Sequence, residues 1–424
     1  MSKKRKIYWR KLDDQAKVFS LSFSKRDTSI FRLSTILKNK IEPNFLQKAL
    51  ELALEKYKAF KVKMQKGFFW YYLVENEKTP IVRKSNKSTY KKINTKSNND
   101  YLFKVTYFDK KINIDYFHTL TDGNSGKEFF KEIIYKYLEL KYPNAIKADF
   151  DDNKIFEDCE NSYTKNYQKN SKKSDVSPKA YQIKGEELEP GKIGINHFSI
   201  KLNELKKYAE TKKSSISMLL VAMISYALYE SNYKKNSGKK PINVCVPINL
   251  KKYFSSETLS NFVSYMIVSL KVKNKKKHSF DDILEMVKSE FAKKLNKEKI
   301  VGTMSSNGRV INNFFIKIVP LPLKRFFVRL GSLEVKRHST LTFSNLGESN
   351  IKSKYSKFIK KFSFELTPDW AEKLRCGVCT HNDNLVISFG SILKDNKIET
   401  KFKELLSENG IKFKLSNNGV NAVV

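Results

Sequence analysis

The sequence predicts an α+β protein in which mixed sheets carry helices in two-layer α/β sandwiches. Two observations lead to this class. Segments with the alternating pattern of strands come in runs, and only a few long amphipathic helices separate these runs. The chain has 424 residues, of which 40% are hydrophobic, and this is enough to form two cores.

The first predicted unit covers residues 1–150. Pro43 fits the first position of a helix, because its missing N–H would be unpaired there in any case. A second helix follows Gly123, where apolar residues recur with helical spacing. The strands that we expect around these helices are Val18–Phe23, Ile30–Ile36, Phe60–Met64, Gly67–Val74, Leu102–Tyr107 and Lys111–Phe117.

Residues 151–192 are poor in apolar side chains and predict a linker or crossing segment before a second unit at 193–424. The helix Ile216–Tyr229, capped by Ser214 or Ser215, is apolar all round and should run through the core. The other elements expected in this unit are strands at 194–200, 242–248, 261–270, 339–344, 361–366, 371–380 and 385–392, and helices after 202, at 279–297 and at 398–406.

Residues 310–331 mix apolar and basic residues around two prolines. We expect a helix pair packed on the core here, and contact with a membrane surface is the less favoured alternative. No run of the sequence is long and apolar enough to predict a membrane-spanning helix or a signal peptide.

The strand at 111–117 ends at His118, which opens the pattern HxxxDG with Asp122 and Gly123. A histidine at the end of a strand, before a tight turn, is held rigidly and can act as a general base near neutral pH. Asp122 would supply local hydrogen bonds, and Gly123 a backbone angle that other residues resist. On the local pattern alone, a structural histidine with Asp122 as a helix cap fits equally well.

The net charge of +38 comes mostly from lysine and is spread along the chain. Because no nucleic-acid-binding motif accompanies this charge, a generally basic surface is favoured over a nucleic-acid site. Such a surface would also attract a polyanionic cosubstrate.

Four cysteines are too few for a disulfide scaffold, and they indicate a reducing, cytoplasmic compartment. Cys376, Cys379 and His381 have the spacing of metal ligands, but no fourth ligand accompanies them, so we predict no metal site. Buried apolar cysteines are the better interpretation.

Beyond the HxxxDG motif, several segments resemble the bacterial alcohol acetyltransferase-like family. This family belongs to the superfamily of chloramphenicol acetyltransferases and peptide-synthetase condensation domains. The segments that carry the resemblance are Tyr8–Phe19, Gly67–Tyr72, Val246–Lys251, Asn261–Ser264, Leu341–Gly347 and Leu385–Leu406, in the family's order over nearly the whole chain.

The resemblance implies two similar subdomains that form a pseudo-dimer, with a tunnel between them and His118 midway along it. It implies an acyl-CoA-dependent O-acyltransferase that moves an acetyl or acyl group from a CoA thioester to a small alcohol or amine. Acetyl-CoA would be a cosubstrate, with no permanently bound cofactor, and we expect a monomer.

In this interpretation His118 takes the acceptor's proton as a general base. Asp122 orients it through a cation, for which Lys61 is the best match. Ser344 is the candidate oxyanion donor, with Asn345 considered for both this and a cofactor contact. Asn261 is a candidate pantetheine contact. For each of these last three residues, ordinary strand hydrogen bonding is the favoured interpretation.

Two alternatives stay open. One is a condensation-type enzyme whose donor is bound to an acyl carrier protein. The other is a non-catalytic scaffold that binds a carrier or another polyanion. Replacement of His118 by alanine separates enzyme from scaffold, and competition between the two donors separates the enzymes.

Overall fold

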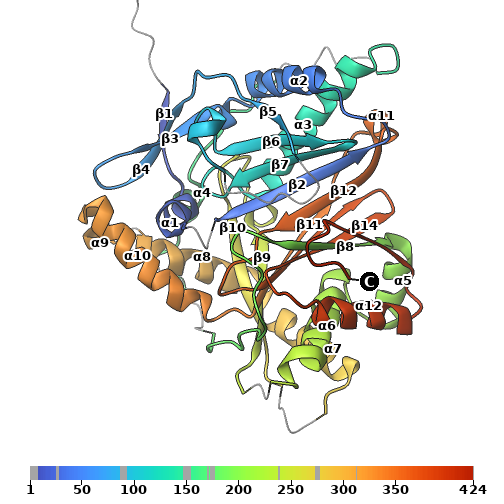
Figure 1. Ribbon diagram of the computed structural model, residues 1–424. Helices are drawn as coiled ribbons and strands as arrows, with labels where there is room; N and C mark the ends of the chain where they lie inside the picture. The colour runs from blue at the N-terminus through green and yellow to red at the C-terminus, as the bar shows by residue number, and fades with distance from the viewer. Residues whose placement is uncertain are drawn as a thin grey trace, which may run out of the picture.

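The computed structural model describes residues 8–24, 28–85, 93–146, 154–169, 171, 177–236, 239–272, 277–311 and 313–423. Two main sheets lie at the centre, each with helices on its outer face (Figure 1). This is the mixed α/β architecture that the alternating and helical segments predicted. The two hydrophobic cores are separate, one for each sheet and its helices.

The first sheet has five strands in the order β12-β2-β7-β6-β5. Its apolar face packs on two helices through residues such as Ile114 and Phe129, both fully buried. A three-stranded sheet, β1-β4-β3, lies beside it. The elements of this part are β1 (Trp9–Lys11), α1 (Asp14–Ser22), β2 (Ile30–Leu37), α2 (Pro43–Lys56), β3 (Val62–Lys66), β4 (Tyr71–Glu75), β5 (Val82–Lys84), β6 (Phe103–Phe108), β7 (Lys111–Phe117) and α3 (Gly123–Lys141), with the 3₁₀ turns η1 (Lys58–Phe60) and η2 (Lys96–Asn98).

The strand predicted at Val18–Phe23 is wrong, because these residues belong almost entirely to helix α1. Asp13 caps that helix, with its side chain accepting a hydrogen bond from the N–H of Ala16 at 2.7 Å. The alternation of apolar residues and serines resembled a strand, but the cap and the packing of α1 against later helices decide the conformation.

The second sheet has seven strands in the order β10-β9-β11-β13-β14-β8-β15. The apolar helix α6 lies on it, capped by Ser215 as predicted, and continues into a π-helical turn. The elements of this part are α4 (Ser162–Lys165), β8 (Gly194–Lys201), α5 (Leu202–Thr211), α6 (Ile216–Leu228), η3 (Tyr229–Tyr233), β9 (Ile242–Asn249), η4 (Leu250–Lys252), β10 (Val263–Leu270), α7 (Phe280–Lys294), α8 (Lys297–Ile311), α9 (Phe314–Ile318), α10 (Leu321–Lys336), β11 (Leu341–Glu348), α11 (Ser353–Ser356), β12 (Ile359–Leu366), β13 (Leu374–His381), β14 (Asn384–Ser391), α12 (Lys397–Glu408) and β15 (Phe413–Asn417).

Strand β12 comes late in the chain but pairs with β2 in the first sheet (Figure 1). It also lies across β13 and β14 of the second sheet. Two glycines allow this crossing. A Cβ at Gly377 would lie 2.4 Å from the carbonyl oxygen of Phe364, and a Cβ at Gly390 would lie 2.5 Å from that of Leu366. Glycine within a strand commonly marks such a close approach of another backbone. The first sheet therefore contains one strand, β12, from beyond the predicted domain boundary at residue 193.

We predicted that a helix pair at 310–331 packs on the core, and this prediction of its packing is wrong. Helices α9 and α10 are present, but α9 has no buried residue and several large apolar side chains of α10 are exposed. In Figure 1 the two helices project from one side of the molecule, beside β3 and β4.

Within the described residues, none of the helices alone has the length and apolar character for a membrane span. The segments Leu202–Thr211 and Ile216–Tyr233 have this length and apolar character only when they are counted together, and the chain bends by 83° between them.

Candidate active site

His118 follows directly after β7, where the sequence predicted it. Its backbone N–H donates to the carbonyl of Ser29 at 2.9 Å, which fixes the chain as it leaves the sheet. The imidazole stacks on Phe19 with 4.2 Å between ring centroids and meets the ring of Phe31 edge-on at 5.1 Å. Two aromatic rings and the strand end therefore hold the histidine in one orientation.

The side chain of Asn261 determines which ring nitrogen of His118 carries the proton. Its Nδ2 group donates to Asp13 Oδ2 at 3.0 Å and to the carbonyl of His118 at 3.1 Å. Its Oδ1 lies 2.9 Å from His118 Nδ1 and must accept, so Nδ1 is the protonated nitrogen. The lone pair is then on Nε2, which makes no hydrogen bond with a described residue.

This arrangement corrects the role predicted for Asn261. The residue is fully buried, and both hydrogens of its amide are used within the protein. It positions His118 and presents no atom to a pantetheine chain.

Sequence reasoning missed Asp13 as part of the site. Its Oδ2 accepts from both the backbone N–H and the side chain of Asn261, at 3.1 and 3.0 Å. Burial raises its pKa to about 6, while the hydrogen bonds from Ala16 and Asn261 act in the opposite direction. The only signal in the sequence was an aspartate in front of a helix, which is the usual N-cap pattern.

Burial lowers the pKa of His118 below its ordinary value of 6.5. The hydrogen bond to Asn261 and the charge of Asp122 act in the opposite direction, and the positive charge of Arg375 adds to the lowering. The imidazole is therefore neutral at pH 7, as a general base must be.

Asp122 is buried and caps α3, which is the role that the structural alternative gave it. Its Oδ1 accepts from the N–H of Ser125 at 2.9 Å, and its Oδ2 accepts from the N–H of Phe262 at 3.0 Å. It thereby joins the turn after His118 to the residue next to Asn261.

The cation predicted to act on Asp122 is not found among the described residues. Asp122 forms no ion pair with them, and Lys61 forms none either. Instead Asp115, three residues before His118, pairs with Arg32 at 2.5 Å and Lys104 at 3.2 Å.

Gly123 is needed for space and not for its backbone angle. It is the first residue of α3 and does not have a positive φ. A Cβ at this position would lie 2.8 Å from Leu346 Cδ2 on β11. The glycine therefore lets the start of α3 approach a strand of the second sheet, and the predicted reason is corrected.

His118 lines a cavity of about 680 Å³ between α1, the start of β2, α9 and α10. Most of its wall is apolar, with cations at Lys17, Lys324, Lys336 and Arg375. A second cavity of about 470 Å³ shares Val335, Lys336 and Arg375 with the first. The histidine is thus neither sealed in a core nor on an open surface.

Ser344 and Asn345 do not line the cavity of His118. The Nδ2 of exposed Asn345 donates to the hydroxyl of Ser217 at 3.2 Å, and its Oδ1 accepts from the N–H of Gly347 at 2.8 Å. Neither residue is therefore part of this cavity's wall or of the hydrogen bonds that link His118, Asn261 and Asp13.

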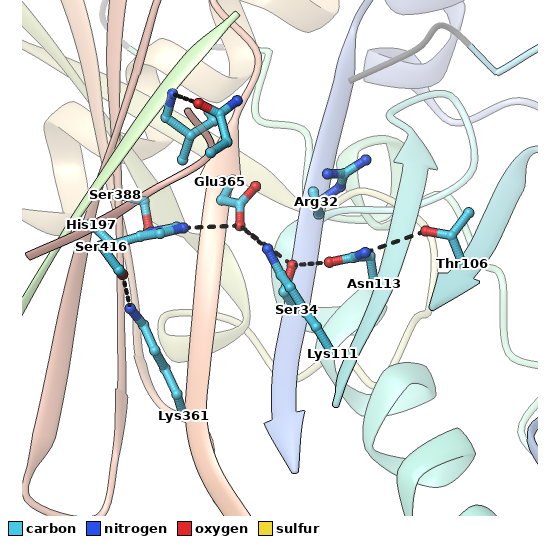
Figure 2. A network of polar contacts seen from close by, with 12 residues as sticks. Arg32, Ser34, Thr106, Lys111, Asn113, His197, Lys361, Glu365, Ser388 and Ser416 are labelled. Atoms are coloured by element: carbon cyan, nitrogen blue, oxygen red, sulfur yellow. Dashed lines mark hydrogen bonds and ion pairs between the residues drawn. The ribbon is translucent and has the colours of Figure 1, made fainter. Parts of the chain in front are cut away.

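A buried polar network joins the inner face of the first sheet to the second sheet (Figure 2). Glu365 of β12 lies 3.5 Å from His197 Nε2 and accepts from the hydroxyl of Ser34 at 3.3 Å. The same hydroxyl donates to Asn113 at 2.8 Å. Burial lowers the pKa of His197 to about 3, so this histidine is neutral and structural.

Cys376 and Cys379 are fully buried, as predicted. Among the described residues, no group of three or more His, Cys, Asp or Glu side chains could hold a metal ion.

Several solved structures share the whole fold of this chain. Polyketide synthase associated protein 5 from Mycobacterium tuberculosis superposes with a TM-score of 0.62 at 12% identity, covering 94% of this chain and 96% of its own. TRI101 of F. sporotrichioides, solved with coenzyme A and T-2, gives 0.61 at 8%, covering 97% and 100%. The epimerization domain of tyrocidine synthetase B gives 0.57 at 11%, covering 95% of each.

These similarities show the two-subdomain pseudo-dimer fold of condensation domains and chloramphenicol acetyltransferase-like enzymes. No family model matches the sequence, and no curated protein matches it.

Proposed function

We propose that this protein is an acyltransferase that moves an acyl group from a CoA thioester to an alcohol or amine, with His118 as the general base. The observation that carries the proposal is a neutral imidazole at the wall of a large cavity, with its Nε2 unbonded to any described residue. Asn261 keeps the proton on Nδ1, so Nε2 can accept one from an attacking hydroxyl or amine.

In the reaction, the acceptor oxygen or nitrogen attacks the thioester carbonyl as Nε2 removes its proton. The tetrahedral intermediate collapses and releases the CoA thiolate, which takes the proton back from the imidazolium. Such general-base assistance contributes about 10²–10⁴-fold. The lowered pKa of His118 suits it to accept a proton at neutral pH.

The fold supports a thioester donor. Among the structures that share it, TRI101 was solved with coenzyme A and T-2, and TRI3 is described as a trichothecene 15-O-acetyltransferase. Membership of the alcohol acetyltransferase-like family is part of the proposal. Lys17, Lys336 and Arg375 of the cavity already pair with carboxylates, so the support for binding the phosphates of CoA is the net charge of +38.

The test is release of free CoA from acetyl-CoA and longer acyl-CoA donors, measured with a thiol reagent over a panel of alcohols and amines. His118→Ala should lower kcat/KM by at least about 10²-fold. His381→Gln is the matched control, since this buried histidine bonds to Ser349 at 2.9 Å and lies outside the cavities. Equal rates in His118→Ala and wild type would overturn the proposal.

The shared fold of condensation domains keeps a carrier-bound donor as a second candidate. Competition between acyl-CoA and an acyl carrier protein decides between them. If only the carrier-bound donor is turned over, the donor is the acyl carrier protein and not CoA, and the role proposed for His118 is unchanged. If no donor is turned over while a carrier or another polyanion binds wild type and His118→Ala alike, the non-catalytic scaffold replaces both.

A further inference from the structure

Helix α10 turns its apolar face outward. Leu323, Phe326, Phe327 and Leu330 have the i, i+3, i+4, i+7 spacing of one helix face, and their exposed fractions are 55%, 58%, 61% and 50%. In a globular protein such a stripe normally faces the core. Among the described residues, none covers this apolar face of the helix.

The orientation of α10 is fixed by specific contacts on its inner face. Lys324 donates to the carbonyl of Phe69 at 2.9 Å and lies 3.6 Å from the centre of the Trp70 ring. Arg329 donates to the carbonyl of Phe23 at 2.8 Å. Because the basic side chains anchor the helix, the outward turn of its apolar face is built into the fold.

The exposed apolar surface continues beyond α10. The N–H of Leu321 donates to the carbonyl of Phe68 at 2.9 Å, which joins the helix to the tip of the β3–β4 hairpin. In Figure 1 this hairpin and α9–α10 project on the same side. We call the whole surface the apolar wedge, and its members are Phe68, Phe69, Phe314, Phe315, Ile318, Leu323, Phe326, Phe327 and Leu330, all at least 41% exposed.

The charge around the apolar wedge is positive. The sequence has no Asp or Glu from 299 to 333, where it has six Lys and Arg, and none from 62 to 74. Lys66 on the hairpin and Lys317 on α9 are exposed. The one carboxylate of α10 is Glu334, one turn beyond Leu330, and it pairs with Lys179 at 2.7 Å and with Arg337 at 3.4 Å. An apolar face bordered mainly by cations fits the interface of an anionic bilayer.

The apolar wedge adjoins the cavity that contains His118. Phe327 and Val335 are 61% and 66% exposed, yet both line the cavity that contains His118. A molecule that lies with its polar end at a lipid surface could enter this cavity without crossing water.

We infer that the apolar wedge docks on the surface of an anionic phospholipid bilayer and that the cavity of His118 receives a lipid-soluble substrate from it. A projecting helix pair and hairpin tip with exposed phenylalanines suit insertion among lipid chains better than the flat face of a protein partner. The docking is inferred from the surface residues alone. The substrate route also rests on the proposed acyl transfer.

The test of docking is flotation of the full-length protein with vesicles of phosphatidylcholine alone or with about 30 mol% phosphatidylglycerol, which gives the vesicles a negative surface potential. We expect binding to the anionic vesicles. The triple variant Phe314→Ser, Phe315→Ser, Phe326→Ser should lower the partition coefficient at least about tenfold, because each side chain would lose apolar burial. The matched control is Ile155→Ser with Leu295→Ser, which removes exposed apolar side chains elsewhere.

Circular dichroism and light scattering accompany these measurements. If folded wild-type protein does not float, or if the triple variant floats like the wild type, the docking is overturned. If the wild type is a dimer that the triple variant dissociates, the wedge binds a second copy and the proposal is also overturned.

The experiments distinguish a failure of membrane docking from a failure of the proposed acyl transfer. Loss of flotation in the triple variant with unchanged turnover of short, water-soluble acceptors supports the wedge, because the site is intact. Flotation without turnover of any acceptor overturns the acyltransfer and leaves the docking in place. Equal loss of turnover for soluble and vesicle-borne acceptors in the folded triple variant would overturn the substrate route.

Discussion

The residues around His118 form a chain that begins at a helix cap. Asp13 holds Asn261, and Asn261 holds the imidazole through Nδ1. None of the three is adjacent in sequence to another, so the chain exists only in the folded protein. Its effect is to leave the lone pair of the ring on Nε2 of a histidine that lines the cavity.

Asn261→Ala should lower kcat by about 10²-fold, since the ring would lose its fixed tautomer and orientation. Rates with saturating acyl-CoA measure this effect. Asn39→Ala is the control, because this exposed amide donates to the hydroxyl of Tyr142 at 2.7 Å, away from the site. An unchanged kcat in Asn261→Ala would show that the hydrogen bond does not position the base.

The lowered pKa of His118 predicts the acid side of the pH–rate profile. Only the neutral imidazole accepts a proton, so kcat/KM should be constant near pH 7 and fall as pH drops through a value below 6.5. The same shift makes the unfolded state bind more protons, so this group's contribution to stability is present above pH 6.5 and is lost on acidification. A midpoint above 6.5 would contradict the assignment.

At the scale of elements, the sequence predicted the strand before His118, the turn and helix α3. It did so because a period of 2 that changes to 3.6 is a local signal. The partners of His118 were not readable, since Asn261 is 143 residues away and its pairing depends on tertiary structure. The helical state of α1 was missed because its strand-like alternation is overridden by a cap and by packing.

Gly123→Ala tests the contact between α3 and β11. The added Cβ would lie 2.8 Å from Leu346 Cδ2, so we expect the free energy of unfolding to fall by about 1–3 kcal/mol through overpacking. Urea denaturation measures it. In a double-mutant cycle, Leu346→Ala should remove most of this penalty.

The control for this prediction is Gly331→Ala on α10, where an added Cβ would meet no described atom within 4 Å. Alanine should be neutral or stabilising there by about 0.5–1 kcal/mol. Equal destabilisation at both glycines would contradict the explanation by crowding.

At the scale of the molecule, β12 makes the first sheet depend on the second half of the chain. Without it, β2 would have an unpaired edge, and apolar residues such as Phe362 would be missing from the first core. Alternation predicted the strand itself, but its partner could not be read from sequence, since strands adjacent in the chain are the default expectation.

We therefore expect residues 1–192 alone to be unfolded or aggregated, although they contain the HxxxDG motif. Circular dichroism and limited proteolysis of this fragment measure the effect, and co-expression with residues 193–424 should recover soluble protein. An independently folded fragment would show that β12 is dispensable.

The position of β12 also sets an order of events during synthesis. Strand β2 ends at residue 37 and its partner begins at 359, which is 322 residues later. At about 5–20 residues per second, the ribosome takes roughly 16 to 64 seconds to make this interval. During that time the edge of β2 is open to other chains, so the nascent protein should bind holding chaperones until residues 359–366 emerge.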